Sequence, residues 1–178
     1  ANNNITNDGT ITVGKNSLAI YSTDGNILNN GTLNIGENGV GIYSDGGNVN
    51  ISNTSNINIG NNSAIGVYGI NGANIQNDSN NINIANGSYG FIVESGSNLT
   101  NSGTVESSEI ELYNMSGYSN TNLIRGGNVS LTTTGNLTLT GTLHGENWLQ
   151  VHGYDILNAG TTTGTGYIEI KGRDITNN

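Results

Sequence analysis

The chain has 178 residues, of which 28 are glycine, none is proline or cysteine, and 10% are charged. Its formal net charge of −9 would repel nucleic-acid phosphates and anionic lipid head groups, so neither nucleic acid nor a membrane surface is an expected partner. No stretch approaches the roughly 18 apolar residues of a membrane helix, so this segment is not expected to insert into a membrane.

A polar composition of this kind could indicate disorder, but three short patterns recur along the chain in a fixed order. The first is an apolar residue followed two positions later by asparagine: Ile5/Asn7, Ile27/Asn29, Ile51/Asn53, Ile75/Asn77 and Leu99/Asn101. The second is a pair of apolar residues two apart: Ile11/Val13, Leu33/Ile35, Ile57/Ile59, Ile82/Ile84 and the degenerate Val105/Ser107.

The third pattern is a small residue, an apolar residue and usually tyrosine. It occurs at Ala19-Ile20-Tyr21, Gly41-Ile42-Tyr43, Gly66-Val67-Tyr68, Gly90-Phe91-Ile92 and, degenerately, Glu111-Leu112-Tyr113. Its copies follow one another at nearly the same interval as those of the first two patterns. Alternation with a period of two is typical of strands rather than helices, so each repeat is predicted to contain three short strands.

The spacing shortens toward the C-terminus. We predict coils with a 21–25-residue period over residues 1–117, a transition at 118–126, and coils with a 19–20-residue period over 127–178, in one continuous solenoid. The shorter period is carried by Val129/Leu131, Leu149/Val151 and Ile168/Ile170, and by Leu137/Leu139, Ile156/Asn158 and Ile175/Asn177.

These columns predict an all-β fold, a parallel β-helix with three short strands per coil. If each coil returns above the last, every strand pairs in parallel with its own copy at a strand spacing of about 4.8 Å. One coil cannot offset the entropy of ordering its own backbone, so stability must come from stacking. The asparagine column, expected to face inward and bond from coil to coil as a ladder, comprises Asn7, Asn29, Asn53, Asn77 and Asn101.

The best surface candidate is a row of tyrosines. If Leu18 and Ile20 face inward, parity places the row outward, beside the small residues Ala19, Gly41 and Gly66. Such a row could form a groove for a sugar or a peptide. Alternatively, the rings stack on one another and cover bare glycine backbone, which would stabilise the sheet. The candidate ligand-binding residues are Tyr21, Tyr43, Tyr68 and Tyr113.

Catalytic residues, metals and cofactors are not expected. The densest acidic group, Glu94, Glu106, Glu109 and Glu111, lacks an Asp-x-Asp-x-Asp-Gly loop, so a solvated face is a better interpretation than a calcium site. His144 and His152 have no partner at metal-ligand spacing. With Trp148 between them, they are expected at the surface or in end packing.

The repeats resemble those of bacterial autotransporter (type V secretion) passenger domains, notably the large fusobacterial type. The resemblance rests on ITNDGTITVGKNSLAIYSTDG at 5–25, ILNNGTLNIGENGVGIYSDGG at 27–47 and LTNSGTV at 99–105. In addition, GNVSLTTTGNLTLTGTL at 127–143 and GYIEIKGRDITNN at 166–178 resemble filamentous-haemagglutinin-type repeats.

The resemblance implies a right-handed β-helix that is secreted across the outer membrane. It would remain at the cell surface, attached through a translocator domain that this chain does not contain. Its implied role is that of a stalk or adhesin that contacts a host-cell protein or glycan, and the fragment itself is expected to be a monomer. The chain starts at Ala1 without methionine, so we expect a piece of a longer, processed protein.

A second class of function is a carbohydrate-active β-helix enzyme of the polysaccharide lyase or glycoside hydrolase type. Such a site needs clustered carboxylates and a basic residue that accepts a proton or binds the substrate. The chain has only four basic residues, Lys15, Arg125, Lys171 and Arg173, and no Gly-x-Ser-x-Gly motif. Enzymatic activity is therefore not expected, and a cleft lined by carboxylates and arginine would reverse this interpretation.

Overall fold

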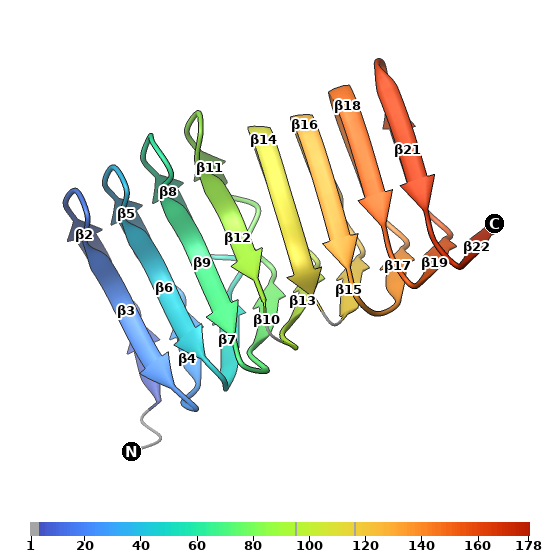
Figure 1. The fold of residues 1–178 in the computed structure, drawn as a ribbon. Helices are drawn as coiled ribbons and strands as arrows, with labels where there is room; N and C mark the ends of the chain where they lie inside the picture. Colours follow the sequence, from blue (N-terminus) through green and yellow to red (C-terminus); the bar gives the residue numbers. More distant parts are fainter. Residues whose placement is uncertain (1–3, 95, 116) are drawn as a thin grey trace.

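The protein is a parallel β-solenoid, as the repeats predict (Figure 1). The structure is a computed structural model that describes residues 4–94, 96–115 and 117–178, without the side chains of residues 107–118. Its strands lie side by side along a rod, in sequence order from the N-terminal to the C-terminal end. No helix with the length and apolarity of a membrane span occurs among the described residues.

The described strands form three parallel sheets, each built from equivalent strands of successive coils. Sheet A contains β1 (Ile5–Asn7), β4 (Ile27–Asn29), β7 (Asn48–Ile51), β10 (Asn74–Asn77), β13 (Asn98–Asn101), β15 (Gly117–Asn120), β17 (Leu137–Leu139), β19 (Asp155–Asn158) and β22 (Asp174–Asn177). Sheet B contains β2 (Thr10–Val13), β5 (Thr32–Ile35), β8 (Asn56–Ile59), β11 (Ile82–Ile84), β14 (Thr104–Met115), β16 (Leu123–Thr133), β18 (Thr142–His152) and β20 (Thr161–Gly164). Sheet C contains β3 (Leu18–Thr23), β6 (Val40–Asp45), β9 (Ile65–Ile70) and β12 (Tyr89–Val93). The remaining strand, β21 (Tyr167–Lys171), pairs with β18 of sheet B.

The apolar columns fill the inside of the rod. The predicted column Ile11, Leu33, Ile57 and Ile82 is in register across β2, β5, β8 and β11. Leu33 and Ile57 are completely buried, whereas Ile11, in the first coil, is half-buried. Period-two alternation is therefore confirmed for β5 and β8, where it selects the buried residues of the strand.

The cross-section changes one coil earlier than predicted. In the first four coils the chain turns between sheets B and C, and Asn16, Asn38 and Asn62 adopt positive φ there, a conformation that asparagine tolerates better than most residues. β14 runs straight through this position as a strand of 12 residues. Leu99 and Tyr118 are already in register at the shorter spacing. The shorter period thus begins at β13–β15, because β14 dispenses with the turn, rather than at 118–126.

The asparagine ladder is present, with one correction. Asn7 donates to Asn29 over 2.7 Å, Asn77 to Asn101 over 2.7 Å, and Asn101 to Asn120 over 2.9 Å. Asn29, Asn77 and Asn101 are completely buried. Each amide therefore satisfies the next, which a buried amide requires.

Asn53 does not belong to this ladder, contrary to the prediction. The register pairs Ile51 with both Asn29 and Asn77, and Asn53 is exposed. The turn from β7 to β8 spans four residues, two more than the turn from β4 to β5, and Asn53 lies in this longer turn. The buried hydroxyl of Ser55 takes over as the acceptor of the Asn29 amide.

Candidate functional site

The tyrosine face is the outward side of sheet C, formed by β3, β6, β9 and β12. Tyr21, Tyr43 and Tyr68 are in register and follow one another along the rod. The ring centroids are 5.5 Å apart for Tyr21–Tyr43, in a tilted arrangement, and 5.2 Å apart for Tyr43–Tyr68, edge to face. Tyr21 is 54% exposed, and the other two are half-buried. The rings therefore stack on one another and still present their outer edges to solvent.

The predicted groove of small residues beside the tyrosines is wrong. Gly41 and Ile42 are both buried, because the strand is irregular between Val40 and Ile42 and the register skips Gly41. A β-carbon on Gly41 would lie 2.4 Å from Ile35 Cδ1. The glycines therefore face the core, where only the absence of a side chain lets the backbone approach Ile35 so closely.

An apolar column takes the place of that groove. Its members are in register across the four strands of sheet C and point outward: Leu18, Val40, Ile65 and Tyr89. Leu18, predicted to face inward, is 45% exposed. The column is visible in the sequence, because an apolar residue recurs three positions before each of these tyrosines. Its outward direction is not, because no residue type marks the strand irregularity that produces it. The tyrosine face thus carries two adjacent apolar columns, which is unusual for a solvent-facing sheet.

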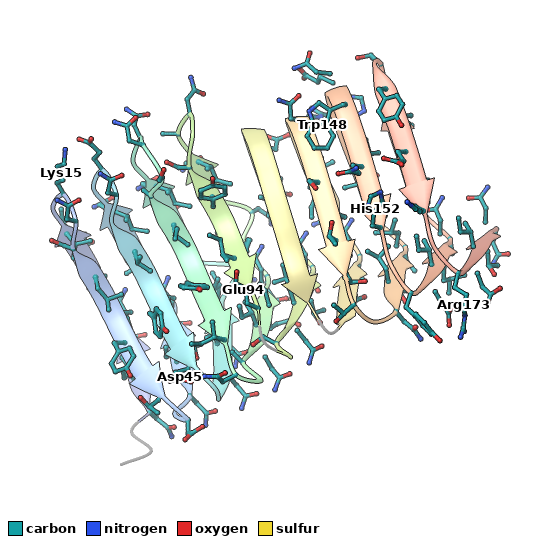
Figure 2. The ribbon with its side chains drawn as sticks, in the orientation of Figure 1. Lys15, Asp45, Glu94, Trp148, His152 and Arg173 are labelled. Carbon is teal, nitrogen blue, oxygen red and sulfur yellow. The ribbon has the colours of Figure 1, made fainter. Side chains whose placement is uncertain are left out.

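One edge of the tyrosine face is acidic and hydrogen-bonded. Tyr68 Oη donates to Glu94 Oε2 over 2.8 Å. In the same region, Asn71 Nδ2 donates to Asp45 Oδ1 over 2.7 Å, and Figure 2 marks Asp45 and Glu94 on this part of the rod. The aromatic row therefore has fixed polar groups beside it, which is the combination that binding surfaces use for orientation.

Among the described residues, the row of tyrosines ends at Ile92. This side chain is in register with Tyr68 and only 7% exposed. Tyr113, the fourth tyrosine of the prediction, lies in the part of β14 whose side chains are outside the described set, and the same holds for Glu109 and Glu111. The candidate site consequently rests on Tyr21, Tyr43 and Tyr68.

The outward faces of sheets A and B differ in kind from the tyrosine face. Their amide side chains bond to one another from coil to coil: Asn48 to Asn26 over 2.8 Å, Asn58 to Asn34 over 2.8 Å, and Asn83 to Asn58 over 2.8 Å. These columns are polar and largely self-satisfied. The contrast makes the tyrosine face the most apolar outward sheet surface of the N-terminal coils.

Charged groups are spread out along the rod. Arg125 lies 3.5 Å from Glu106, and Arg173 lies 2.9 Å from Asp155, both pairs on exposed surface. Among the described side chains, no three His, Cys, Asp or Glu residues lie close enough to hold a metal ion. Arg173 also lies 3.2 Å from Asp174, which is in register with Asp155, so this arginine pairs with two neighbouring carboxylates.

Glu37 has a lowered pKa, chiefly because Lys15 Nζ donates a hydrogen bond to it over 3.0 Å, with a second donor in Asn62. The ionised form is the one favoured in the folded protein, so its stabilising effect is present above the ordinary carboxyl pKa and is lost as the pH falls through the lowered value. We expect Lys15→Met to raise the pKa of Glu37, measured by NMR titration of its side-chain carboxyl. A titration curve that does not move would contradict this assignment.

Comparison with models of protein families, with curated protein sequences and with solved structures gives no significant match to this chain.

Proposed function

We propose that the chain is a surface-exposed passenger segment of a secreted bacterial adhesin. In this proposal the β-helix acts as a stalk, and the tyrosine face contacts a host-cell protein or glycan, or a neighbouring cell. The segment would reach the cell surface through a translocator domain outside this chain. The observation that carries the proposal is the tyrosine face itself, an aromatic and apolar outward surface on N-terminal coils whose other two sheets carry mainly polar side chains outward.

Physical properties of the solenoid and of the tyrosine face support the roles of stalk and contact surface, respectively. A solenoid in which every coil contacts only its neighbours extends in one dimension, which suits a stalk. Tyrosine rings offer large contact areas at low conformational-entropy cost, which suits recognition. The resemblance of the repeats to autotransporter passenger domains supports the location at the cell surface.

The test replaces two tyrosines together. Tyr43→Ala with Tyr68→Ala should weaken binding of the purified chain to host cells by about tenfold, since a well-placed aromatic contributes on the order of 1–2 kcal/mol to an interface. Binding is measured per folded molecule, with the folded fraction taken from circular dichroism of the same preparation. Asn34→Ala with Asn58→Ala, on the outward face of sheet B, serves as the matched control and should bind as the wild type does.

The opposite outcome has a defined meaning. If the tyrosine pair only stabilises the sheet, the double variant will melt at a lower temperature and bind equally well per folded molecule. That result would assign the ring stacking to stability alone and would contradict an adhesive role for this face.

A further inference from the structure

A second outward surface, on the C-terminal coils, combines aromatic and polar side chains. β18 and β21 are paired in register, and their outward residues alternate with Leu149 and Val151, which are completely buried. We name this surface the C-terminal track. It consists of three cross-strand pairs, Trp148 with Tyr167, Gln150 with Glu169, and His152 with Lys171.

The aromatic end of the track is accessible. Tyr167 is 65% exposed and Trp148, the single tryptophan of the chain, is half-buried. The two residues lie on neighbouring strands, so their Cα atoms are about 4.8 Å apart. Figure 2 shows Trp148 and His152 at separate positions along β18. The aromatic pair thus forms one end of a surface about 13 Å long, two outward steps of about 6.6 Å along the strand.

The middle of the track is a fixed hydrogen-bonding pair. Gln150 Nε2 donates to Glu169 Oε2 over 2.9 Å, and this bond is the main reason that the pKa of Glu169 is lowered. The carboxylate is therefore ionised at neutral pH, and its other oxygen can still accept from a ligand. The Gln150 amide, held in position, keeps its carbonyl oxygen as a further acceptor.

The far end of the track opens into a hollow. Thr133, Thr134, Tyr154 and Lys171 line it together with His152. The buried Nε2 of His152 lies 3.4 Å from Glu169 Oε2 without completing a hydrogen bond. Lys171 is exposed and makes no close ion pair among the described side chains. The Lys171 ammonium thus offers hydrogen-bond donors at this end, next to the acceptors of the middle pair.

This order of groups matches the chemistry of a sugar chain. A pyranose ring has an apolar C–H face that stacks on aromatic rings, and hydroxyl groups at its edge that both donate and accept. A polyanionic glycan would be repelled by the Glu169 carboxylate and by the net charge of −9. A neutral sugar has no such repulsion to overcome.

We propose that the C-terminal track binds a neutral oligosaccharide, with a pyranose ring on Trp148 and Tyr167 and its neighbouring hydroxyl groups on Gln150 and Glu169. This site is separate from the tyrosine face and does not depend on the function proposed for it.

Trp148 supplies the readout, because the emission of a single tryptophan reports directly on contact at this site. The full chain is titrated with cello-, manno- and N-acetylchito-hexaose, and with an oligogalacturonate of the same length as the charged comparison. We expect a saturable change in emission with at least one neutral hexaose. Tyr167→Ala and Gln150→Ala should each weaken that binding by about tenfold or more, while Tyr21→Ala, on the tyrosine face, should leave it unchanged.

Tyr167 is largely exposed, so its replacement should leave the fold intact, which circular dichroism of the same samples checks. The proposal is overturned if none of the three neutral probes gives a saturable change, if only the oligogalacturonate does, or if both folded track variants bind as tightly as the wild type. Loss of cell binding in the tyrosine pair with an unaltered hexaose titration would support the two sites as independent.

Discussion

Phe91→Ala is expected to lower the free energy of unfolding by about 3–5 kcal/mol, because truncating a buried phenylalanine removes its apolar contacts and leaves a cavity. Phe91 is 2% exposed and is among the largest fully buried side chains of the described residues. Its neighbour in register is Val67, which is completely buried. β12 pairs with β9 on one side and packs against β14 on the other, so the site has little freedom to collapse.

Urea unfolding followed by circular dichroism measures this loss. Tyr21→Ala is the matched aromatic truncation at a 54% exposed position on the same sheet, and it should cost clearly less. Equal losses in the two variants would mean that Phe91 is not enclosed by the stack.

The second large effect concerns the asparagine ladder. Asn101→Ala removes a buried amide that accepts from Asn77 and donates to both Asn120 and the carbonyl of Gly103. At least two buried polar groups then lose a partner, which should cost on the order of 3 kcal/mol in total. Thermal and urea unfolding of the variant measure the change.

Asn53→Ala is the control for this variant, because Asn53 follows the same apolar-x-Asn pattern but lies exposed in the turn after β7. Its replacement should change stability by no more than about 0.5 kcal/mol, as is usual for surface positions. A similar loss from both substitutions would contradict the register that separates them.

The periodic part of the fold is predictable from the sequence because burial imposes it directly. Leu33 and Ile57 alternate with polar residues, and any other register would expose them. The same holds for Val129 and Leu149, which pair in register at the shorter spacing, as predicted. Strand type, parallel pairing and the inside of the rod therefore follow from hydrophobic alternation alone.

The local irregularities are not predictable in the same way. Asn53 is displaced because the turn after β7 is longer by two residues. The sequence does not reveal this, because Ile51 faces the core whether it is aligned with Ile27, as the pattern suggests, or with Asn29, as in the structure. The inward position of Gly41 depends on a strand irregularity that shifts parity by one residue, and glycine itself has no side chain to indicate a face. The tyrosine row could be placed outward from sequence, but its apolar neighbours could not.

The C-terminal track could be placed from the repeat. Leu149/Val151 and Ile168/Ile170 are successive copies at the shorter period, so their neighbours Trp148 and Tyr167 are expected to pair. The register of β18 with β21 confirms this pairing and places Gln150 beside Glu169. A solenoid converts a constant sequence spacing into a constant spatial neighbour, so the track becomes visible once the coil length is known.

The most direct test of the proposed secreted stalk is antibody labelling of intact cells that produce the full-length protein, using antibody raised against this segment. We expect unpermeabilised cells to be labelled and the label to disappear after brief treatment with external protease. Labelling that requires permeabilised cells and resists external protease would contradict a secreted stalk.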